Sequence, residues 1–356
     1  MSDSKVYRAI GLMSGTSLDG VIDVALIETD GQDYVRPLRY FAYPYDISVR
    51  DKVRACFGKV ERDAQVDDVE RLVTDLHVEA VRAFDESADI IGFHGQTLTH
   101  DPDSGFTWQI GDGERLARET GINVACDMRM DDIRAGGQGA PLLPLYHKAL
   151  LSDQKKPVAV LNLGGVSNIT YIGEGGDLIA FDCGPANALM DDFMKLRTGE
   201  EFDRNGSMAS HGTVQENLVE SFLNDPYFDQ KPPKSLDRNR WSIECVRYAT
   251  KENGMATLLE MSVGAIARAM EHTNGAPEIV YVAGGGRKNI FLMESIAQRL
   301  GTQVCAVEDL SWNGDATESE GFAYLAVRSF LGLPLTVPTT TGVPKPMTGG
   351  VLYRAA

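Results

Sequence analysis

Residues 13–20 carry the residue types that a phosphate-binding turn requires. The two glycines of the segment leave backbone N–H groups unhindered, its threonine and serine add hydroxyl donors, and Asp19 offers a carboxylate for the Mg²⁺ that accompanies phosphate groups. We expect a phosphate chain to contact Gly15, Thr16, Ser17, Leu18, Asp19 and Gly20. No Walker A pattern is present, and a tight hairpin whose glycines only satisfy turn geometry is the alternative.

Two more glycine clusters stand at expected strand ends. Residues 162–168 lie between two apolar runs, and residues 280–289 follow an apolar run and open a helix. Such glycines let a flat nucleoside approach the backbone, and a helix N-terminus favours anionic groups. The expected nucleotide-binding positions are Gly164, Gly165, Gly284, Gly285, Gly286 and Asn289. In order and separation, the three clusters resemble the phosphate-1, phosphate-2 and adenosine elements of the actin, hexokinase and heat-shock ATPase superfamily.

Asp182 is the candidate catalytic residue. It follows the apolar strand predicted over residues 178–181 and precedes a Cys-Gly-Pro turn, so we expect its carboxylate at a strand end. That position suits a general base. The alternative is that Asp182 caps a helix that begins near Pro185, because aspartate is a preferred N-cap residue.

Five motifs closely resemble the anhydro-N-acetylmuramic acid kinase family. They are residues 10–20, 94–97, 135–142, 162–165 and 181–187. The resemblance runs from about residue 7 to the end of the sequence. It implies an ATP- and Mg-dependent sugar kinase that phosphorylates O6 of 1,6-anhydro-N-acetylmuramic acid while water opens the anhydro bridge. The implied products are N-acetylmuramic acid 6-phosphate and ADP, in the recycling of peptidoglycan.

With the resemblance, a set of polar residues becomes the expected sugar-binding site: His94, Gln96, Thr97, Arg129, Gln138 and Glu318. Each has a structural alternative. Without the resemblance, a satisfied core histidine is the favoured interpretation of His94, and residues 135–141 are equally a hinge or a plain turn. Arg129 could form a surface ion pair with an aspartate that follows it. Glu318 could stabilise the N-terminus of a helix through its negative charge.

Three positions depart from the family pattern: Met128 replaces a phenylalanine, Ala186 replaces a glycine, and one acid is displaced. The family usually places an acid two residues after the last glycine of the first turn, whereas here Asp23 comes one residue later. We therefore expect Asp23 to be a structural strand residue.

Apolar periodicity predicts an α/β protein with two similar halves. Strands are expected over residues 7–13, 21–28, 158–163 and 167–172, so that each half starts with antiparallel strands joined by a glycine turn. The expected fold is two related actin-like ATPase (ribonuclease H-like) domains with mixed sheets around a central cleft. The first domain is expected to contain residues 1–130 and about 335–356, and the second residues 131–334.

The composition limits the classes of partner. Of the 356 residues, 43% are hydrophobic and 24% are charged, which is typical of a globular protein with a packed core. The formal charge of −17 disfavours nucleic acid and anionic membranes, and no apolar run is long enough for a membrane span. We expect a cytoplasmic protein that acts on small molecules, and the resemblance implies a homodimer. Two other functions stay open: another sugar or carboxylic acid kinase of the superfamily, and a nucleotide-binding regulator without catalysis.

Overall fold

The computed structural model describes residues 5–15, 18 and 20–355, which form two compact units. Unit 1 contains Met1–Asp153 and Ala316–Ala356, and unit 2 contains Gln154–Asp315. The first boundary, between residues 153 and 154, comes later in the chain than the expected boundary after residue 130. The second, between residues 315 and 316, comes earlier than the expected boundary after residue 334. The helices that follow residue 130 and residue 316 belong to unit 1 because their apolar side chains enter its core.

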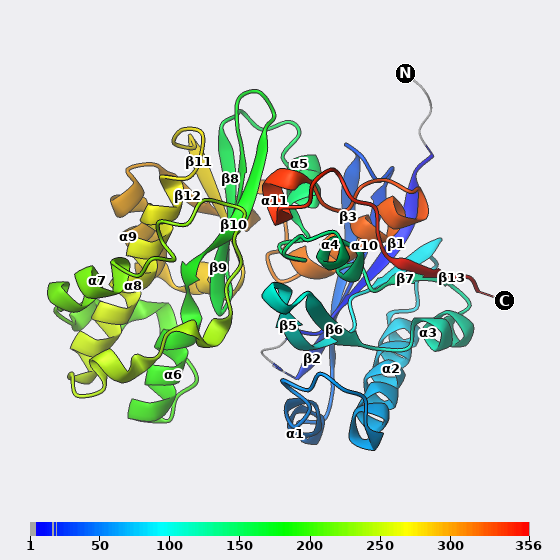
Figure 1. Cartoon of the computed structure of the whole chain (residues 1–356), viewed down its shortest axis with the longest axis horizontal. Coiled ribbons are helices and arrows are strands. Elements are labelled where there is room, and N and C mark those ends of the chain that lie inside the picture. The colour runs from blue at the N-terminus through cyan, green and yellow to red at the C-terminus, as the bar shows by residue number, and fades with distance from the viewer. Residues whose placement is uncertain (1–4, 16–17, 19, 356) are drawn as a thin grey trace. The chain divides into compact units, whose positions relative to one another are not determined.

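Unit 1 is built on a six-stranded mixed sheet with the order β13-β7-β4-β1-β2-β3 (Figure 1). Its strands are β1 (Tyr7–Met13), β2 (Val21–Thr29), β3 (Val35–Pro44), β4 (Ile90–Phe93), β7 (Asn123–Cys126) and β13 (Val351–Tyr353). Strands β1, β2 and β3 are antiparallel neighbours, whereas β4 runs parallel to β1 and β7 runs parallel to β4. A separate hairpin joins β5 (Gln96–Asp101) to β6 (Phe106–Ile110).

Within its described residues, unit 1 also has seven α-helices, and those that pack on the sheet cover both of its faces. The seven are α1 (Ser48–Arg54), α2 (Ala64–Phe84), α3 (Gly113–Thr120), α4 (Met130–Arg134), α5 (Pro144–Leu150), α10 (Thr317–Phe330) and α11 (Pro338–Thr341). The alternation along β1 decides the packing, since successive side chains of a strand point to opposite faces. Ile10 and Leu12 pack with α2 and α3, whereas Tyr7 and Ala9 pack with α5 and α10.

Helix α10 lies unusually close to the middle of the sheet. Gly11 of β1 and Gly92 of β4 are paired neighbours, and neither position has room for a side chain. A Cβ atom at Gly11 would lie 1.7 Å from the backbone oxygen of Ser319, and one at Gly92 would lie 2.0 Å from that of Phe322. Glycine at these two positions therefore lets α10 pack directly on the backbone of the sheet.

Unit 2 has a five-stranded sheet with the order β10-β9-β8-β11-β12 (Figure 1). The strands are β8 (Val158–Leu163), β9 (Val166–Ile172), β10 (Leu178–Pro185), β11 (Ile279–Ala283) and β12 (Gln303–Ala306). The helices are α6 (Asn187–Thr198), α7 (Glu216–Leu223), α8 (Lys251–Met270) and α9 (Ile290–Leu300). The main core joins Leu161, Phe181 and Val282 of the sheet to side chains such as Phe193 of α6 and Leu258 of α8.

The two sheets share one strand order. In each unit, three antiparallel strands in sequence are extended by two strands that run parallel to the first. The order is thus 3-2-1-4-5 in both units, which is the ribonuclease H-like topology. In unit 1 the C-terminal strand β13 is added to this order, antiparallel to β7. The predicted fold class, α/β with two related mixed-sheet domains, is confirmed.

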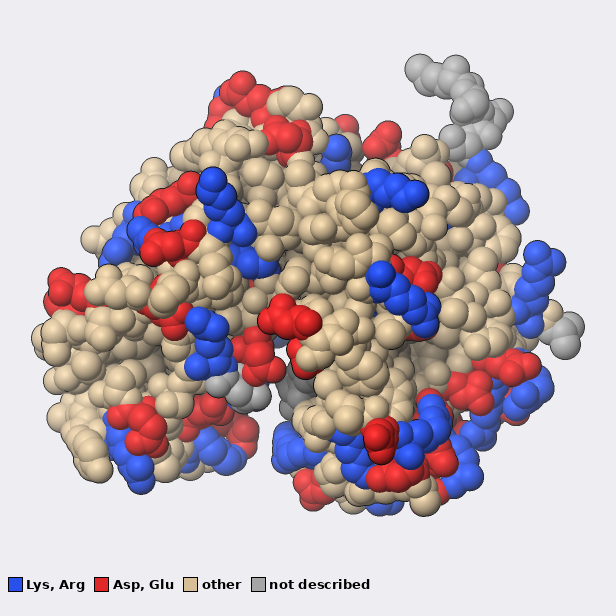
Figure 2. All heavy atoms as spheres, viewed as in Figure 1, with Lys and Arg blue, Asp and Glu red and all other residues tan. Residues whose placement is uncertain are grey.

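The surface is charged but mixed in sign. On the face drawn in Figure 2, acidic and basic side chains are interspersed rather than separated. Within the described ranges, every helix is too short or too polar to span a bilayer.

Candidate functional site

The first glycine turn joins β1 to β2, and the structure describes part of it. Thr16, Ser17 and Asp19 lie outside the described residues. Leu18 has a positive φ of 50° and its N–H donates to the Gly15 oxygen over 3.2 Å. The Leu18 side chain is buried in the core, with 1% of its surface exposed, so a ligand at this residue would meet the backbone and not the side chain.

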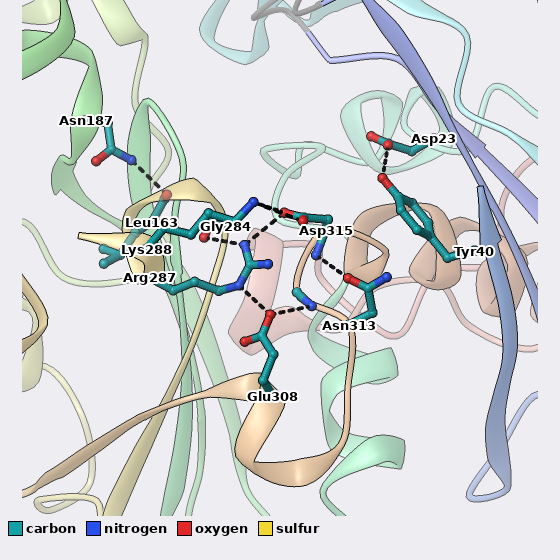
Figure 3. Close-up of polar contacts among 11 residues, drawn as sticks. Asp23, Tyr40, Leu163, Asn187, Gly284, Arg287, Lys288, Glu308, Asn313 and Asp315 are labelled. Carbon is teal, nitrogen blue, oxygen red and sulfur yellow. Dashed lines mark hydrogen bonds and ion pairs between the residues drawn. The ribbon is translucent and has the colours of Figure 1, made fainter. Parts of the chain in front are cut away.

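The corresponding turn of unit 2 is tied to the start of helix α6. Gly164 and Gly165 connect β8 to β9, and their carbonyl oxygens accept the N–H groups of Asn187 over 3.0 Å and of Ala186 over 2.9 Å. The Asn187 side chain adds a bond to the Leu163 oxygen over 2.9 Å (Figure 3) and one to the Gly164 oxygen over 2.8 Å. Asn187 belongs to one of the family motifs, but the sequence alone assigned it no role.

The third cluster follows β11, and its three glycines are not equivalent. A Cβ atom at Gly284 would lie 2.4 Å from the Asn162 side chain, and one at Gly286 would lie 2.6 Å from Cβ of Leu163. Close packing against β8 therefore accounts for both glycines. A Cβ atom at Gly285 would meet no atom of the described residues within 4 Å, so Gly285 is the glycine at which a ligand can approach the backbone. Asn289 caps α9, because its side-chain oxygen accepts the N–H of Leu292 over 3.0 Å.

The same cluster ends in a network of charged side chains. Arg287 is 9% exposed, and its guanidinium contacts Glu308 over 2.8 Å and Asp315 over 3.0 Å (Figure 3). Lys288 also reaches Asp315, over 2.9 Å. These ion pairs connect the turn after β11 to residues 308–315 of the same unit.

Asp182 lies on β10 at a β-bulge. The pairing with β9 shifts register between Asp182 and Gly184, and the Asp182 side chain is half-buried. Its Oδ2 atom accepts the N–H of Leu236 over 2.8 Å. Helix α6 begins at Asn187, and its N-cap residue is Ala186 without a side-chain cap. The alternative that Asp182 caps this helix is therefore wrong.

In unit 1, the structure brings two of the predicted sugar-binding residues, His94 and Arg129, into contact. The Arg129 guanidinium donates to the Gly139 oxygen over 2.8 Å and lies 3.2 Å from Nε2 of His94. His94 is 7% exposed, and its Nδ1 contacts the Gly95 oxygen over 2.7 Å. Burial, and then the neighbouring Arg129, lower the pKa of His94 to about 3. The ring is therefore neutral and accepts a hydrogen bond from Arg129.

A buried aspartate outside the predicted set fixes the loop between α4 and α5. Asp132 is 2% exposed, and its Oδ1 accepts the N–H of Gly139 over 2.7 Å. Its Oδ2 accepts the hydroxyl groups of Thr336 and Thr341 over 2.5 and 2.6 Å. Gln138 lies in this loop and donates its N–H to the Thr341 oxygen over 2.7 Å. The segment 135–141 is thus a fixed loop within unit 1.

The other predicted residues lie elsewhere in unit 1. Gln96 is buried at the start of β5, and the neighbouring Thr97 accepts a bond from Gln109 over 3.2 Å. Glu318 is exposed in the first turn of α10. Asp23 accepts the Tyr40 hydroxyl over 2.6 Å, which ties β2 to β3 (Figure 3). Its place inside β2 agrees with the expected strand role.

The chain has two α/β units of ribonuclease H-like topology, each with a glycine turn between its first two strands. This is the architecture of the two-domain, actin-like class of proteins. A sequence model of the family described as "Anhydro-N-acetylmuramic acid kinase" matches residues 7–355. The chain belongs to this family, and it is therefore a sugar kinase.

Individual relatives support the assignment. The chain is 49% identical to the anhydro-N-acetylmuramic acid kinase of Rhizorhabdus wittichii, over 97% of this chain and 98% of the relative. It is 48% identical to the enzyme of that name from Zymomonas mobilis, over 97% and 99% of the two chains. Among solved structures, a ligand-bound xylulose kinase from Lactobacillus acidophilus aligns with a TM-score of 0.46 and 11% identity, over 98% of this chain and 94% of that one. A likeness at that level adds nothing to the family assignment.

Proposed function

We propose that this protein transfers the γ-phosphoryl group of ATP to O6 of 1,6-anhydro-N-acetylmuramic acid while water opens the anhydro bridge. The family match over residues 7–355 carries the proposal. The products are N-acetylmuramic acid 6-phosphate and ADP. We further propose that the protein acts in peptidoglycan recycling and in the cytoplasm.

Asp182 is the proposed general base. Its carboxylate takes a proton from the water that attacks the anomeric carbon, and the bond between that carbon and O6 breaks. O6 forms the new bond to the γ-phosphorus, and ADP leaves. The half-buried carboxylate, which accepts the Leu236 N–H, supports this role because its position is fixed while part of its surface remains accessible.

The nucleotide and Mg²⁺ are proposed to use the glycine clusters. Gly285 is the position with open space at the backbone, and Asp19 is the proposed carboxylate for Mg²⁺. Among the described residues, no group of three His, Cys, Asp or Glu side chains could hold a metal ion. A phosphate-bound Mg²⁺ requires only one or two protein carboxylates, so a single aspartate fits this ion.

The sugar is proposed to contact unit 1 through the residues around His94 and Arg129. A guanidinium suits the lactyl carboxylate of a muramic acid, since it can make paired hydrogen bonds to the two oxygens. The neutral His94 ring and the fixed loop with Gln138 supply groups for sugar hydroxyls. Gln96, Thr97 and Glu318 complete the proposed set, and the family resemblance supports a homodimer in solution.

The test is the identity of the product formed in ¹⁸O-labelled water. The enzyme is incubated with Mg-ATP and 1,6-anhydro-N-acetylmuramic acid, and products are analysed by mass spectrometry. We expect a sugar that gains one phosphoryl group and one water, with ¹⁸O in the sugar and none in the phosphoryl group. A sugar that gains only a phosphoryl group would indicate a simple kinase, and free phosphate beside an unchanged sugar would contradict the proposal.

A further inference from the structure

A lysine of unit 2 is buried beside the strand that carries Asp182. Lys234 is only 6% exposed, although lysine is rarely buried without partners. Its Nζ atom donates to the backbone oxygens of Tyr227 over 2.9 Å and of Phe228 over 3.4 Å. The side chain therefore turns back on its own chain and closes the loop that runs from residue 227 to residue 234.

Aromatic rings complete the surroundings of this ammonium group. Nζ lies 4.5 Å from the ring centre of Tyr227 and 5.6 Å from that of Phe181, which is within the range of cation–π attraction. Phe181 directly precedes Asp182 on β10. Burial lowers the pKa of Lys234 to about 8, so the group is still mostly charged at neutral pH. The charge thus links the loop to the strand that carries the proposed base.

The loop that Lys234 closes also holds Asp182. Strand β10 is at the edge of its sheet, so among the described strands none pairs with its outward N–H and C=O groups. At Asp182, the N–H donates to the Lys234 oxygen over 3.1 Å and the C=O accepts the Tyr227 hydroxyl over 2.6 Å. The Leu236 N–H binds the carboxylate itself. Residues 227–236 thus fix both the backbone and the side chain of Asp182.

We propose that Lys234 is a positioning residue for the proposed reaction: its buried ammonium group holds the 227–236 loop in the geometry that aims the Asp182 carboxylate. Lys234 acts through the loop and through Asp182. It makes no contact with substrate in this proposal. The inference rests on the proposed function, since it assigns the device that places the proposed base.

The principal variant is Lys234→Met, which keeps the length and apolar stem of the side chain and removes the charge and the donors. A displaced base slows the chemical step without changing ground-state contacts to substrate. We therefore expect kcat to fall about 10-fold to 100-fold, on the scale known for misplaced catalytic groups. The KM values for ATP and for the sugar should stay within about twofold. Lys234→Arg, which keeps charge and donors, should restore part of the lost kcat.

A matched control lowers stability next to this loop but keeps Lys234 and every bond from the loop to Asp182. Trp241 stacks on Phe228 with ring centres 5.4 Å apart, and its Nε1 donates to Asp225 over 3.0 Å. Trp241→Phe removes that hydrogen bond and should lower thermal stability while kcat stays near the wild-type value. If Trp241→Phe and Lys234→Met lose kcat in proportion to their loss of stability, Lys234 has only a structural role and the proposal is wrong.

Hydrogen exchange provides a readout that does not depend on turnover. In the complete protein, Lys234→Met should speed amide exchange in peptides that contain Asp182 and Leu236, because these two N–H groups form the bonds that the loop maintains. Unchanged exchange in both peptides would overturn the proposal, as would faster exchange with an unchanged kcat. Hydrogen exchange does not require turnover. If the wild-type protein forms no labelled sugar, the exchange experiment therefore still tests whether Lys234 fixes the position of Asp182.

Discussion

Each unit contains an aspartate whose carboxylate accepts a hydrogen bond from a loop of the same unit, and the two carboxylates differ in their surroundings. Asp132 in unit 1 is buried and accepts three hydrogen bonds, from one backbone N–H and two threonine hydroxyls. Asp182 in unit 2 is half-buried, and its carboxylate accepts the Leu236 N–H. Both residues connect distant segments of their own unit. Only Asp182 also retains accessible surface.

The difference suits Asp132 to a structural role and Asp182 to the proposed role of general base. A buried carboxylate with both oxygens engaged would lose its hydrogen bonds if it took up a proton, so Asp132 is suited to hold a loop. A carboxylate that is held in place and still accessible at its surface can exchange a proton with a bound water. The same substitution at the two positions should therefore have opposite consequences.

The largest expected effect is the loss of turnover in Asp182→Asn. The amide still accepts the Leu236 N–H through its oxygen but cannot take a proton, so kcat should fall about 10²-fold to 10⁴-fold. The melting temperature should change little, and both substrates should still bind. Steady-state kinetics and calorimetry on the same preparation measure the two quantities. A variant with a lowered melting temperature and normal turnover would show that Asp182 has a structural role and is not the base.

A smaller effect, on stability, is expected for Asp132→Asn. Asn can keep the bond from Gly139, but its NH₂ group then faces the hydroxyls of Thr336 and Thr341, which now donate to a carboxylate oxygen. We expect the free energy of unfolding to fall by about 2 kcal/mol. The kcat of the remaining folded enzyme should stay within a few-fold of wild type. Chemical denaturation checks the first value, and an unchanged midpoint would show that the three bonds contribute little.

A further effect on stability, confined to a window of pH, is expected for Glu320→Gln. Glu320 is buried in unit 1, where Oε2 accepts the Tyr146 hydroxyl over 2.6 Å, and burial raises the pKa of Glu320 from 4.5 to about 7. The unfolded chain loses this proton near pH 4.5 and the folded protein near pH 7, so the group makes stability fall as pH rises through this window. The full shift corresponds to about 3 kcal/mol.

In Glu320→Gln this contribution should disappear, so the stability of the variant relative to wild type should increase between about pH 5 and 7. The difference between the two proteins is the quantity to measure. Buried histidines act in the opposite direction in wild type and variant alike, because burial lowers the pKa of His77 and of His147 to about 4. A parallel pair of stability curves would show that Glu320 does not titrate in this window.

Most strands were predictable because each unit begins with strongly apolar segments bounded by glycine turns. The predicted strand over residues 7–13 is confirmed by β1, and that over residues 158–163 by β8. The predicted strand before Asp182 was too short. Strand β10 continues to Pro185, because a bulge lets the chain pass Asp182 and rejoin the ladder at Gly184. Periodicity of side chains does not reveal a bulge.

The surroundings of the candidate residues could not be predicted in the same way. Lys234 and Asp132 owe their roles to contacts with residues far along the chain, namely Asp182 for the first and Thr336 and Thr341 for the second. A lysine beside two prolines, or one aspartate in an acidic pair, has no pattern of its own in the sequence. The motif glycines were recognised, but packing explains Gly284 and Gly286, whereas Gly285 is open.

The position of α10 has a consequence for the order in which the protein is made. Unit 2 is one continuous segment, but unit 1 needs α10, which follows unit 2 in the chain and fills the space over Gly11 and Gly92. During synthesis, the ribosome therefore releases the first strands of unit 1 long before the helix that covers their Tyr7 and Ala9 face. Unit 2 can fold in this interval as a complete domain. The part of this apolar sheet face that α10 covers in the folded protein stays uncovered until residues 317–330 emerge, whereas α5, which also packs on it, is made before unit 2.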